Sequence, residues 1–253
     1  PSTTLLCESL PDSIQSGVNF ELDTGEEAPV LAIRKVLGLK PGASFPEMTV
    51  KLGTTRGTNA LLTRTGARTA FVTTRGFADV LLIANQDRPR LFDLAIQKPE
   101  PLFESILEID ARMDAHGNEL TAPDCDAVRH DLEKLRATGV ESIAICLLHA
   151  FADGRHERLV EDLARQVGFT EISTSSRLSP LIRIVSRGDT TVVDAYLNPV
   201  LRDYVQQIRR RLGDHCTLKL MTSAGGLVDA ASFVGKDSIL SGPAGGVIGF
   251  SKV

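Results

Sequence analysis

The sequence predicts an α/β fold in which strands and helices alternate along most of the chain. Two observations lead to this prediction. Short apolar runs typical of buried parallel strands, such as residues 142–148, are followed by amphipathic segments of helical period, such as residues 155–167. The alternation fits crossover connections, which join parallel strands of an open sheet. With 253 residues, the chain has room for one large domain or two small ones.

The first part of the chain predicts a helix, then a β-α-β unit, then a second helix. The apolar periodicity places them, in order, at 26–37 (helix), 48–53 (strand), 55–64 (helix), 69–74 (strand) and 76–85 (helix). Residues 86–101 contain three prolines and show no period. We therefore expect a long connection there, held by its own side chains or by a partner. Alternation over residues 106–113 predicts a strand, followed by a turn at 114–118.

A second β-α pattern follows this turn. Thr121 is expected to cap a helix, with Asp124 completing a capping box and Gly139 ending the helix. The remaining elements of this part are a strand over 142–148, a helix over 155–167 and a strand over 171–174.

The character of the sequence changes near residue 180, where we place a domain boundary. Residues 188–212 are mostly helical in pattern, with Asp189 as the expected N-cap. Asn198-Pro199 interrupts this pattern, so we expect a kink there or a new helix capped by Asn198. Three features complete the pattern: a strand over 218–222, a tight turn at Gly225-Gly226, and a strand-like Ile239-Leu240.

The composition argues against two classes of partner. The net charge is −4 and no basic stripe is present, so we expect no nucleic-acid partner. No apolar stretch approaches the roughly 18 residues that span a bilayer, so we expect no membrane partner. The cysteines lie far apart, without a Cys-x-x-Cys pair, and no N-glycosylation sequon occurs. These features predict a soluble cytoplasmic protein with free thiols.

The best chemical signal is the glycine-rich segment Ser241-Gly-Pro-Ala-Gly-Gly246. Glycines let the backbone approach a ligand, and amide N–H groups at a helix N-terminus bind anions. The segment is neither a Walker A motif nor a G-x-G-x-x-G fingerprint. The alternative is that Gly245, Gly246 and Gly249 simply allow close helix packing, and the residues alone leave both interpretations open.

A second candidate is Gly53-Thr54-Thr55 with Asn59, at the end of a predicted strand. It offers hydroxyls, an amide and free N–H groups at the carboxyl end of a strand, where open α/β sheets bind ligands. The alternative, favoured by spacing alone, is that Thr54 or Thr55 is an ordinary helix N-cap.

Two arginines and one histidine complete the candidates. Arg75 and Arg88 lie at or beyond the ends of predicted elements, where a guanidinium can hold a carboxylate or phosphate. Exposed or salt-bridged arginines are the commoner case. His149 follows the buried strand, and we expect it to be a hydrogen-bonded rim residue. No histidine pair has the spacing of a metal site.

Three blocks of sequence together resemble one known family. They read GTTRGTNALL (53–62) with VTTRGFADV (72–80), QDRPRLFDL (86–94), and TTVVDAYLNPV (190–200) with LSGPAGGV (240–247). In this order and spacing they closely resemble the hydantoinase A and 5-oxoprolinase family, whose relatives include acetone carboxylase β subunits. The resemblance covers most of the chain from Lys51 onward.

The resemblance implies ribonuclease-H-like lobes of the actin and sugar-kinase ATPase superfamily, which clasp ATP between them. It also implies an enzyme that uses ATP and Mg²⁺ to open a small cyclic amide such as 5-oxoproline or a hydantoin. Phosphorylating the carbonyl or enol oxygen makes the amide electrophilic. No catalytic residue is assigned. The residues then expected near nucleotide or substrate are Gly53, Thr54, Thr55, Asn59, Ser241, Gly242, Gly245 and Gly246, while Arg75 and Arg88 are expected at the substrate or an interface.

The chain departs from the family pattern at two places. The family carries an Asp-x-Gly-Gly-Thr-Phe-Thr-Asp phosphate loop and a later Asp-x-Gly-Gly-Thr-Ser-Thr-Asp loop, and neither occurs in this sequence. We therefore expect an interior fragment, inactive alone and without tightly bound cofactor or metal. Residues 1–180 would be an N-terminal-type region that lacks the first loop, and residues 181–253 the start of the core domain.

Two other functions remain open on the sequence. The chain can be a scaffold or docking segment for a B-type subunit or fused domain, or part of an ATP-dependent ketone carboxylase. The sequence leaves open which cyclic amide or ketone is the substrate.

Overall fold

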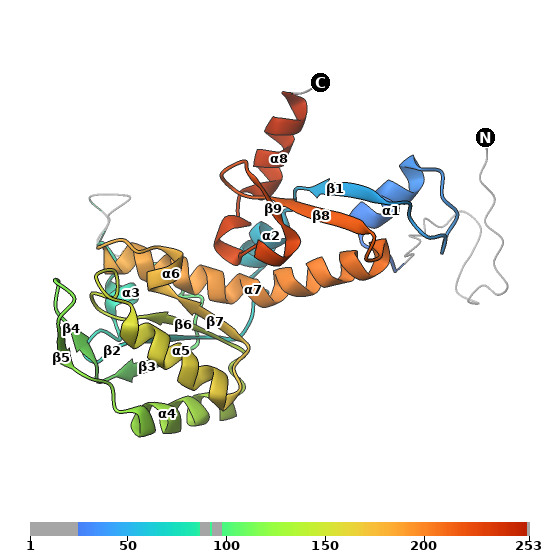
Figure 1. The fold of residues 1–253 in the computed structure, drawn as a ribbon. Helices are drawn as coiled ribbons and strands as arrows, with labels where there is room; N and C mark the ends of the chain where they lie inside the picture. The colour runs from blue at the N-terminus through green and yellow to red at the C-terminus, as the bar shows by residue number, and fades with distance from the viewer. Residues whose placement is uncertain (1–24, 87–91, 93–97, 252–253) are drawn as a thin grey trace, which may run out of the picture.

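The computed structural model describes residues 25–86, 92 and 98–251, and it confirms the predicted α/β class (Figure 1). Two sheets, each covered by helices, lie along one long helix, α7 (Ile184–Leu212). A separate two-stranded hairpin joins β4 (Arg112–Met113) to β5 (Glu119–Thr121). Within the described ranges, no helix is both long and apolar enough to cross a membrane.

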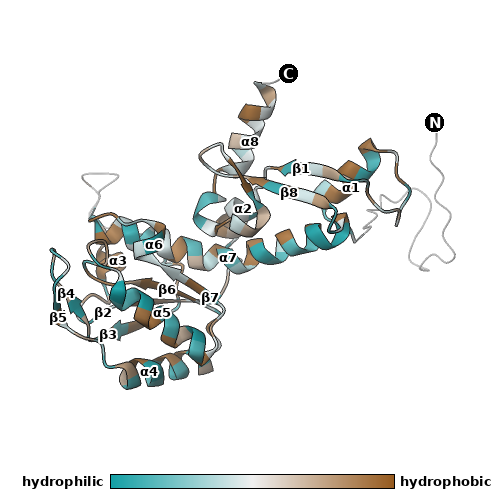
Figure 2. Cartoon of the chain, in the orientation of Figure 1, coloured by the Kyte–Doolittle hydropathy of each residue, from teal (hydrophilic) through white to brown (hydrophobic). Residues whose placement is uncertain are grey.

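The larger sheet has four parallel strands in the order β3-β2-β6-β7. Its strands are β2 (Thr69–Thr74), β3 (Ser105–Ile109), β6 (Ser142–Cys146) and β7 (Glu171–Thr174). Helices α4 (Cys125–Ala137) and α5 (Arg155–Val167) cover one face, and α7 covers the other (Figure 1). Figure 2 shows the mainly hydrophobic strand β6 and a largely hydrophilic outer side of α5.

The smaller sheet has the order β1-β8-β9. Strand β1 (Met48–Leu52) runs parallel to β8 (Cys216–Met221), and β9 (Leu227–Asp229) is antiparallel to β8. Helix α1 (Ala28–Val36) and the second half of α7 pack on this sheet. Because β1 precedes residue 180 and β8 follows it, the smaller sheet joins segments from both predicted domains. The division at residue 180 stays a prediction.

Helix α7 is continuous through Pro199, so the predicted alternative of a new helix capped by Asn198 is wrong. Proline lacks the N–H that would bond to the carbonyl four residues earlier, that of Ala195. The Ser142 hydroxyl, from β6, donates to that carbonyl at 2.7 Å and replaces the missing bond. The next carbonyl, of Tyr196, accepts from the backbone N–H of Ala67 at 3.0 Å.

Two predicted N-caps are also wrong. Helix α7 begins four residues before Gly188, and Asp189 lies inside it. Helix α4 is capped by Asp124, whose side chain accepts from the N–H groups of Asp126 and Ala127. Thr121, the predicted cap, belongs to β5. Both predicted caps are residue types that favour helix N-termini. The helices nevertheless begin elsewhere, α4 after Asp124 and α7 after Arg183.

The predicted helix over 76–85 and the predicted strand over 106–113 are both shorter than expected. Helix α3 (Val80–Ile83) is one turn, because Ala84 turns the chain with a positive φ of 52°. The strand breaks after Ile109, whose carbonyl accepts from Arg75 and Ala111. The residues beyond the break form β4 and pair with β5 instead. Most of the predicted connection at 86–101 lies outside the described residues.

Replacing Ser142 with alanine is expected to destabilise the fold by about 1–3 kcal/mol, because the buried Ala195 carbonyl loses its donor. Pro199→Ala restores a helical N–H to the same carbonyl. The cost of Ser142→Ala is therefore expected to be smaller in the Pro199→Ala background. Urea unfolding of the four proteins of this double-mutant cycle measures the difference, and strictly additive costs would contradict the assignment.

Candidate functional site

The two glycine-containing segments predicted to bind nucleotide or substrate meet in the structure. Gly53 follows β1, and Ser241 begins helix α8 (Ser241–Phe250). A Cβ added to Gly53 would lie 3.2 Å from the Ser241 carbonyl oxygen and 3.6 Å from the Gly245 Cα. A side chain at residue 53 would push the two segments apart, so glycine is needed for this contact. We call the meeting point of residues 53–55 with residues 241–245 the glycine junction.

The Ser241 side chain fastens the glycine junction from inside. It is completely buried, and its Oγ lies 2.7 Å from the carbonyl oxygen of Thr54 and 2.8 Å from that of Ser238. Its hydroxyl is therefore occupied by protein acceptors and is not presented to a ligand. Ser241 holds the end of β1 against α8.

The glycine-rich segment is helical, which corrects two expectations. Ile239-Leu240 is not a strand but leads into α8, and residues 241–246 are its first turns and not a loop. A Cβ added to Gly242 would lie 2.6 Å from the Thr55 Cγ2, so that glycine serves close packing. Nothing lies within 4 Å of a Cβ added to Gly246 or Gly249. The packing interpretation thus accounts for Gly242. A Cβ on Gly245 would only reach ordinary contact, 3.5 Å from the Gly53 Cα, and packing does not account for Gly246 or Gly249.

The polar groups of the β1–α2 turn differ in exposure. Helix α2 (Arg56–Thr63) starts directly after Thr55. Thr54 is buried, and its Oγ1 accepts from the Arg56 N–H at 3.1 Å. Thr55 is the N-cap, but its side chain makes no capping bond, and both it and Asn59 are exposed. The polar side chains open to a ligand beside the glycine junction are therefore the Thr55 hydroxyl and the Asn59 amide.

The two candidate arginines do not join the glycine junction. Arg75 lies at the carboxyl end of β2 in the larger sheet, where its Nε is 3.4 Å from Asp110 Oδ2 in an exposed ion pair. This is the salt-bridged alternative stated for it. Arg88 lies outside the described residues.

A buried polar network at the carboxyl ends of β6 and β7 was not predicted. Glu157 and Arg187 are fully buried and are bridged by the Ser175 hydroxyl, which donates to Glu157 at 2.5 Å and accepts from Arg187 at 2.9 Å. Arg187 Nη2 also donates to the Leu147 carbonyl at 2.7 Å, and Glu157 accepts from the Leu147 N–H at 2.9 Å. No local pattern marks these residues, because Glu157 occupies an ordinary position of an amphipathic helix.

The Cys146 thiol and the His149 imidazole lie near this network, and their surroundings are those of structural rather than reactive groups. Burial raises the pKa of the Cys146 thiol to about 11, so it is protonated and a poor nucleophile at neutral pH. His149 has its Nδ1 2.8 Å from the Met113 carbonyl oxygen, which fits the predicted rim histidine. Among the residues that the structure describes, no group of three His, Cys, Asp or Glu side chains is placed to hold a metal.

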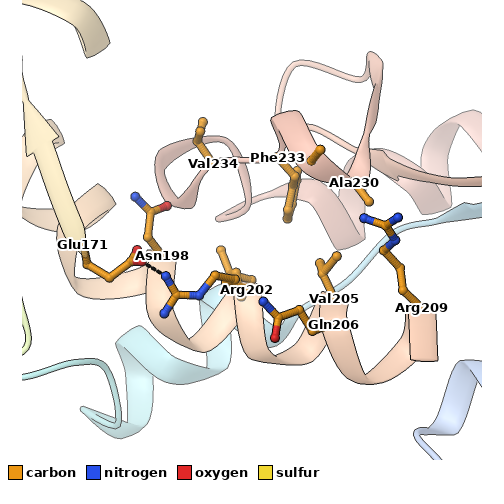
Figure 3. Close-up of a pocket in the computed structure, with 11 residues that line it drawn as sticks. Glu171, Asn198, Arg202, Val205, Gln206, Arg209, Ala230, Phe233 and Val234 are labelled. Atoms are coloured by element: carbon orange, nitrogen blue, oxygen red, sulfur yellow. Dashed lines mark ion pairs between the residues drawn. The ribbon is translucent and has the colours of Figure 1, made fainter. Parts of the chain in front are cut away.

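An open pocket lies between the middle of α7 and residues 230–234 (Figure 3). Glu171 and Arg202 form an ion pair at one end, and Arg209 lies at the other. Phe233 and Val205 supply apolar surface between them. The pocket contains none of the predicted site residues.

Comparison with protein families identifies the chain. The family model for the hydantoinase/oxoprolinase N-terminal region matches residues 11–168, and the hydantoinase/oxoprolinase model matches residues 187–253. The chain belongs to the hydantoinase/oxoprolinase family. The glycine junction therefore joins one segment from each of the two family regions.

Individual relatives agree with this assignment. The 5-oxoprolinase of Saccharomyces cerevisiae is 38% identical, covering 89% of this chain and 20% of its own length. The acetophenone carboxylase gamma subunit of Aromatoleum aromaticum is 27% identical, covering 96% of this chain and 35% of its own. This hydantoinase/oxoprolinase chain thus spans about a fifth of the length of the 5-oxoprolinase it matches.

A solved structure supports the fold. The ATP-dependent caprolactamase of Pseudomonas jessenii superimposes with a TM-score of 0.73 at 23% identity, covering 88% of this chain and 35% of that one. At this identity the likeness shows the fold alone. It confirms that this hydantoinase/oxoprolinase chain has the fold of an ATP-dependent relative.

Adding a methyl group at Gly242 is expected to loosen the glycine junction. The free energy of unfolding of Gly242→Ala, measured in urea, should be about 1–3 kcal/mol lower than that of Gly246→Ala. Only the methyl group at residue 242 meets the Thr55 Cγ2. Thr55→Ser removes that methyl group and should recover most of the loss. Equal stability of the two alanine variants, or no recovery, would show that the contact is not tight.

Proposed function

We propose that this chain is part of an ATP-dependent enzyme that opens cyclic amides. The observation on which this proposal mainly rests is the glycine junction itself, where Thr54 of the first family region meets Ser241 of the second. The names of two similar proteins, a 5-oxoprolinase and an ATP-dependent caprolactamase, both refer to enzymes of ring-shaped amides. The substrate class proposed is therefore a small lactam or hydantoin, with 5-oxoproline as the first candidate.

The chemistry proposed is activation of an unreactive amide by phosphoryl transfer. When bound, ATP supplies a phosphoryl group that makes the amide carbon electrophilic once its oxygen is phosphorylated. The Thr55 hydroxyl and the Asn59 amide are exposed at the carboxyl end of β1 and can donate hydrogen bonds to phosphate oxygens. Their role is to bind and orient, which is the main contribution a protein makes to phosphoryl transfer.

The described residues do not fit a Mg²⁺ ion. No cluster of three ligating side chains exists within these ranges, and Ser241, the buried hydroxyl of the glycine junction, is taken up by two carbonyls. The proposal therefore assigns no metal ligand to this chain. Carboxylates that hold Mg²⁺ would have to come from other parts of the complete enzyme.

Ketone carboxylation is the second candidate, supported by the acetophenone carboxylase gamma subunit among the relatives. The same phosphorylation of a carbonyl or enol oxygen would activate a ketone. In amide opening, water then attacks the activated amide carbon. In carboxylation, the activated ketone attacks a carbon dioxide equivalent such as bicarbonate. Assays with each class of substrate distinguish the two outcomes.

A multi-subunit assembly is also part of the proposal. The relative named as a gamma subunit belongs, by its name, to an assembly of several subunits. We propose a B-type hydantoinase polypeptide, separate or fused, as the partner. Phe92 is 92% exposed within the predicted connection and provides an apolar contact for it.

The complete enzyme is expected to hydrolyse ATP only when a suitable ring is present. The assay measures inorganic phosphate with 5-oxoproline, a hydantoin and caprolactam in parallel, and with acetone and bicarbonate as the carboxylation arm. Stimulation by a ring supports amide opening, and stimulation by the ketone alone supports the second candidate. No stimulation by any of the rings would defeat the proposal.

Asn59→Ala is expected to raise the KM for ATP by about tenfold, because one hydrogen bond to a charged phosphate oxygen is lost. The Asn59 side chain is exposed, so the stability of the protein should not change. Leu62→Ala, which shortens a 79% exposed side chain on the same helix, is the matched control and should keep the wild-type KM. An unchanged KM for Asn59→Ala would remove α2 from the nucleotide site.

A further inference from the structure

Asp194 is a buried charge without a cationic partner among the residues that the structure describes. It is 2% exposed. Its Oδ2 accepts from the Ser173 hydroxyl at 2.7 Å and from the Asn198 Nδ2 at 2.9 Å, and its Oδ1 accepts from the Lys236 N–H at 2.9 Å. A buried carboxylate is strongly unfavourable unless hydrogen bonds replace its water. The three donors meet that requirement and fix the carboxylate in one orientation.

Asn198 extends the same arrangement one helical turn further along α7. Its Nδ2 donates to Asp194, and its Oδ1 accepts from the Gly235 N–H at 2.7 Å. Figure 3 shows the Asn198 amide reaching from α7 toward the segment that contains Val234. The two side chains therefore hold two successive backbone N–H groups of the turn η2 (Gly235–Asp237). We call Asp194 and Asn198 the α7 clamp.

The α7 clamp also requires a glycine at residue 235. A Cβ added there would lie 2.7 Å from the Asp194 carbonyl oxygen and 3.0 Å from the Asn198 Oδ1. Any side chain would separate η2 from α7 and break both backbone hydrogen bonds. The glycine and the clamp thus form one close contact.

From η2 a short path of hydrogen bonds leads to the glycine junction. The Ser238 hydroxyl donates to the Gly235 carbonyl at 2.7 Å, and the Ser238 carbonyl lies 2.8 Å from the Ser241 Oγ. Ser241 in turn contacts the Thr54 carbonyl. Ser238 and Ser241 are fully buried, so water does not compete for these bonds.

We propose that Asp194 and Asn198 are positioning residues, which set the place of Thr54 and Thr55 through residues 235–241. Ser173 lies on β7 of the larger sheet, so the same cluster ties that sheet to the β1–α2 turn of the smaller one. What the turn binds rests on the proposed function. The mechanical link itself does not depend on it.

Exchanging the two side chains tests the proposal. Asn198→Asp places a second carboxylate against Asp194, and Asp194→Asn leaves an Asn198 N–H without its carboxylate acceptor. The double variant Asp194→Asn/Asn198→Asp restores one donor and one acceptor across the pair and keeps an oxygen for each η2 N–H. Ser173 can adapt, because a hydroxyl accepts as well as donates.

Backbone amide exchange of the 253-residue chain is the primary measurement. Each single variant is expected to exchange about tenfold faster over residues 235–241 and at the amides of Arg56 and Asn59, which bond to the Thr54 Oγ1 and to the Thr55 carbonyl. A tenfold change corresponds to the loss of one charge-assisted bond. The double variant should return to within about twofold of wild type at both segments. Helix α4, which packs on α5 and β3 and not on β7 or α7, should keep its wild-type exchange in all variants and serves as the reference.

Two results would overturn the proposal. In the first, faster exchange is confined to residues 235–236 while the amides of Arg56 and Asn59 keep wild-type protection. In the second, the double variant fails to recover. If a single variant does not fold, Ser173→Ala, which removes one of the three donors to Asp194, replaces it and must show the same two-segment pattern. A double variant that also does not fold counts against the pairing.

The complete enzyme provides the functional arm of the test. Each single variant is expected to lower the kcat of ring-stimulated ATP hydrolysis, and the double variant to recover it. The kcat is expressed per folded enzyme, so that a loss of stability does not contribute to the difference. If wild-type enzyme shows no ring-stimulated hydrolysis but the exchange pattern holds, the proposed function fails and the positioning role stands. If hydrolysis is normal and exchange at Arg56 and Asn59 is unaffected by every variant, the positioning role fails and the proposed function stands.

Discussion

The continuity of helix α7 through Pro199 is the constraint on which the arrangement of the two sheets depends. With 29 residues, α7 is about 44 Å long, enough to span both sheets. Its first half packs Val192 and Ala195 on the larger sheet, and its second half packs Tyr204 and Ile208 on the smaller one. The helix continues through the proline, and Ser142 of β6 donates to the carbonyl that Pro199 leaves without its helical N–H.

The turn of α7 just before the proline also makes hydrogen bonds in two directions, to the larger sheet and to the segment that leads to the glycine junction. Ala195 accepts from Ser142, and Asn198 holds Gly235. Side chains and carbonyls on one turn thus bond to β6 on one side and to η2 on the other. A helix turn that lacks a backbone bond is weaker, and here tertiary hydrogen bonds replace what the proline removes. The local weakness and the long-range connection occur at the same place.

The carboxyl ends of the two sheets differ in what occupies them. Open α/β sheets bind ligands at this edge. In the larger sheet, the ends of β6 and β7 are filled by Glu157, Ser175 and Arg187, whose charges and hydroxyl bond to one another and to backbone groups. In the smaller sheet, the end of β1 leaves the Thr55 hydroxyl exposed. This contrast favours the smaller sheet as the ligand-binding edge.

Elements whose signal is local could be predicted from the sequence, and those that depend on distant partners could not. The helix at 155–167 and the strands at 69–74 and 171–174 match the structure, because their periodicity lies within the segment. The short strands β5 and β9 have no such period and exist through pairing. The two segments of the glycine junction were singled out separately from their residue types. No spacing relates Gly53 to Ser241, so their contact could not be predicted from the sequence.

The helical state of residues 241–246 changes how the glycines relate to ligand binding. A phosphate loop uses glycines so that backbone N–H groups can surround an anion. Here a Cβ on Gly242 would lie 2.6 Å from the Thr55 Cγ2, so the small size of this residue serves the approach of α8 to the β1–α2 turn. For the proposed nucleotide site, the exposed polar side chains are therefore those of Thr55 and Asn59, on the β1–α2 side of the glycine junction.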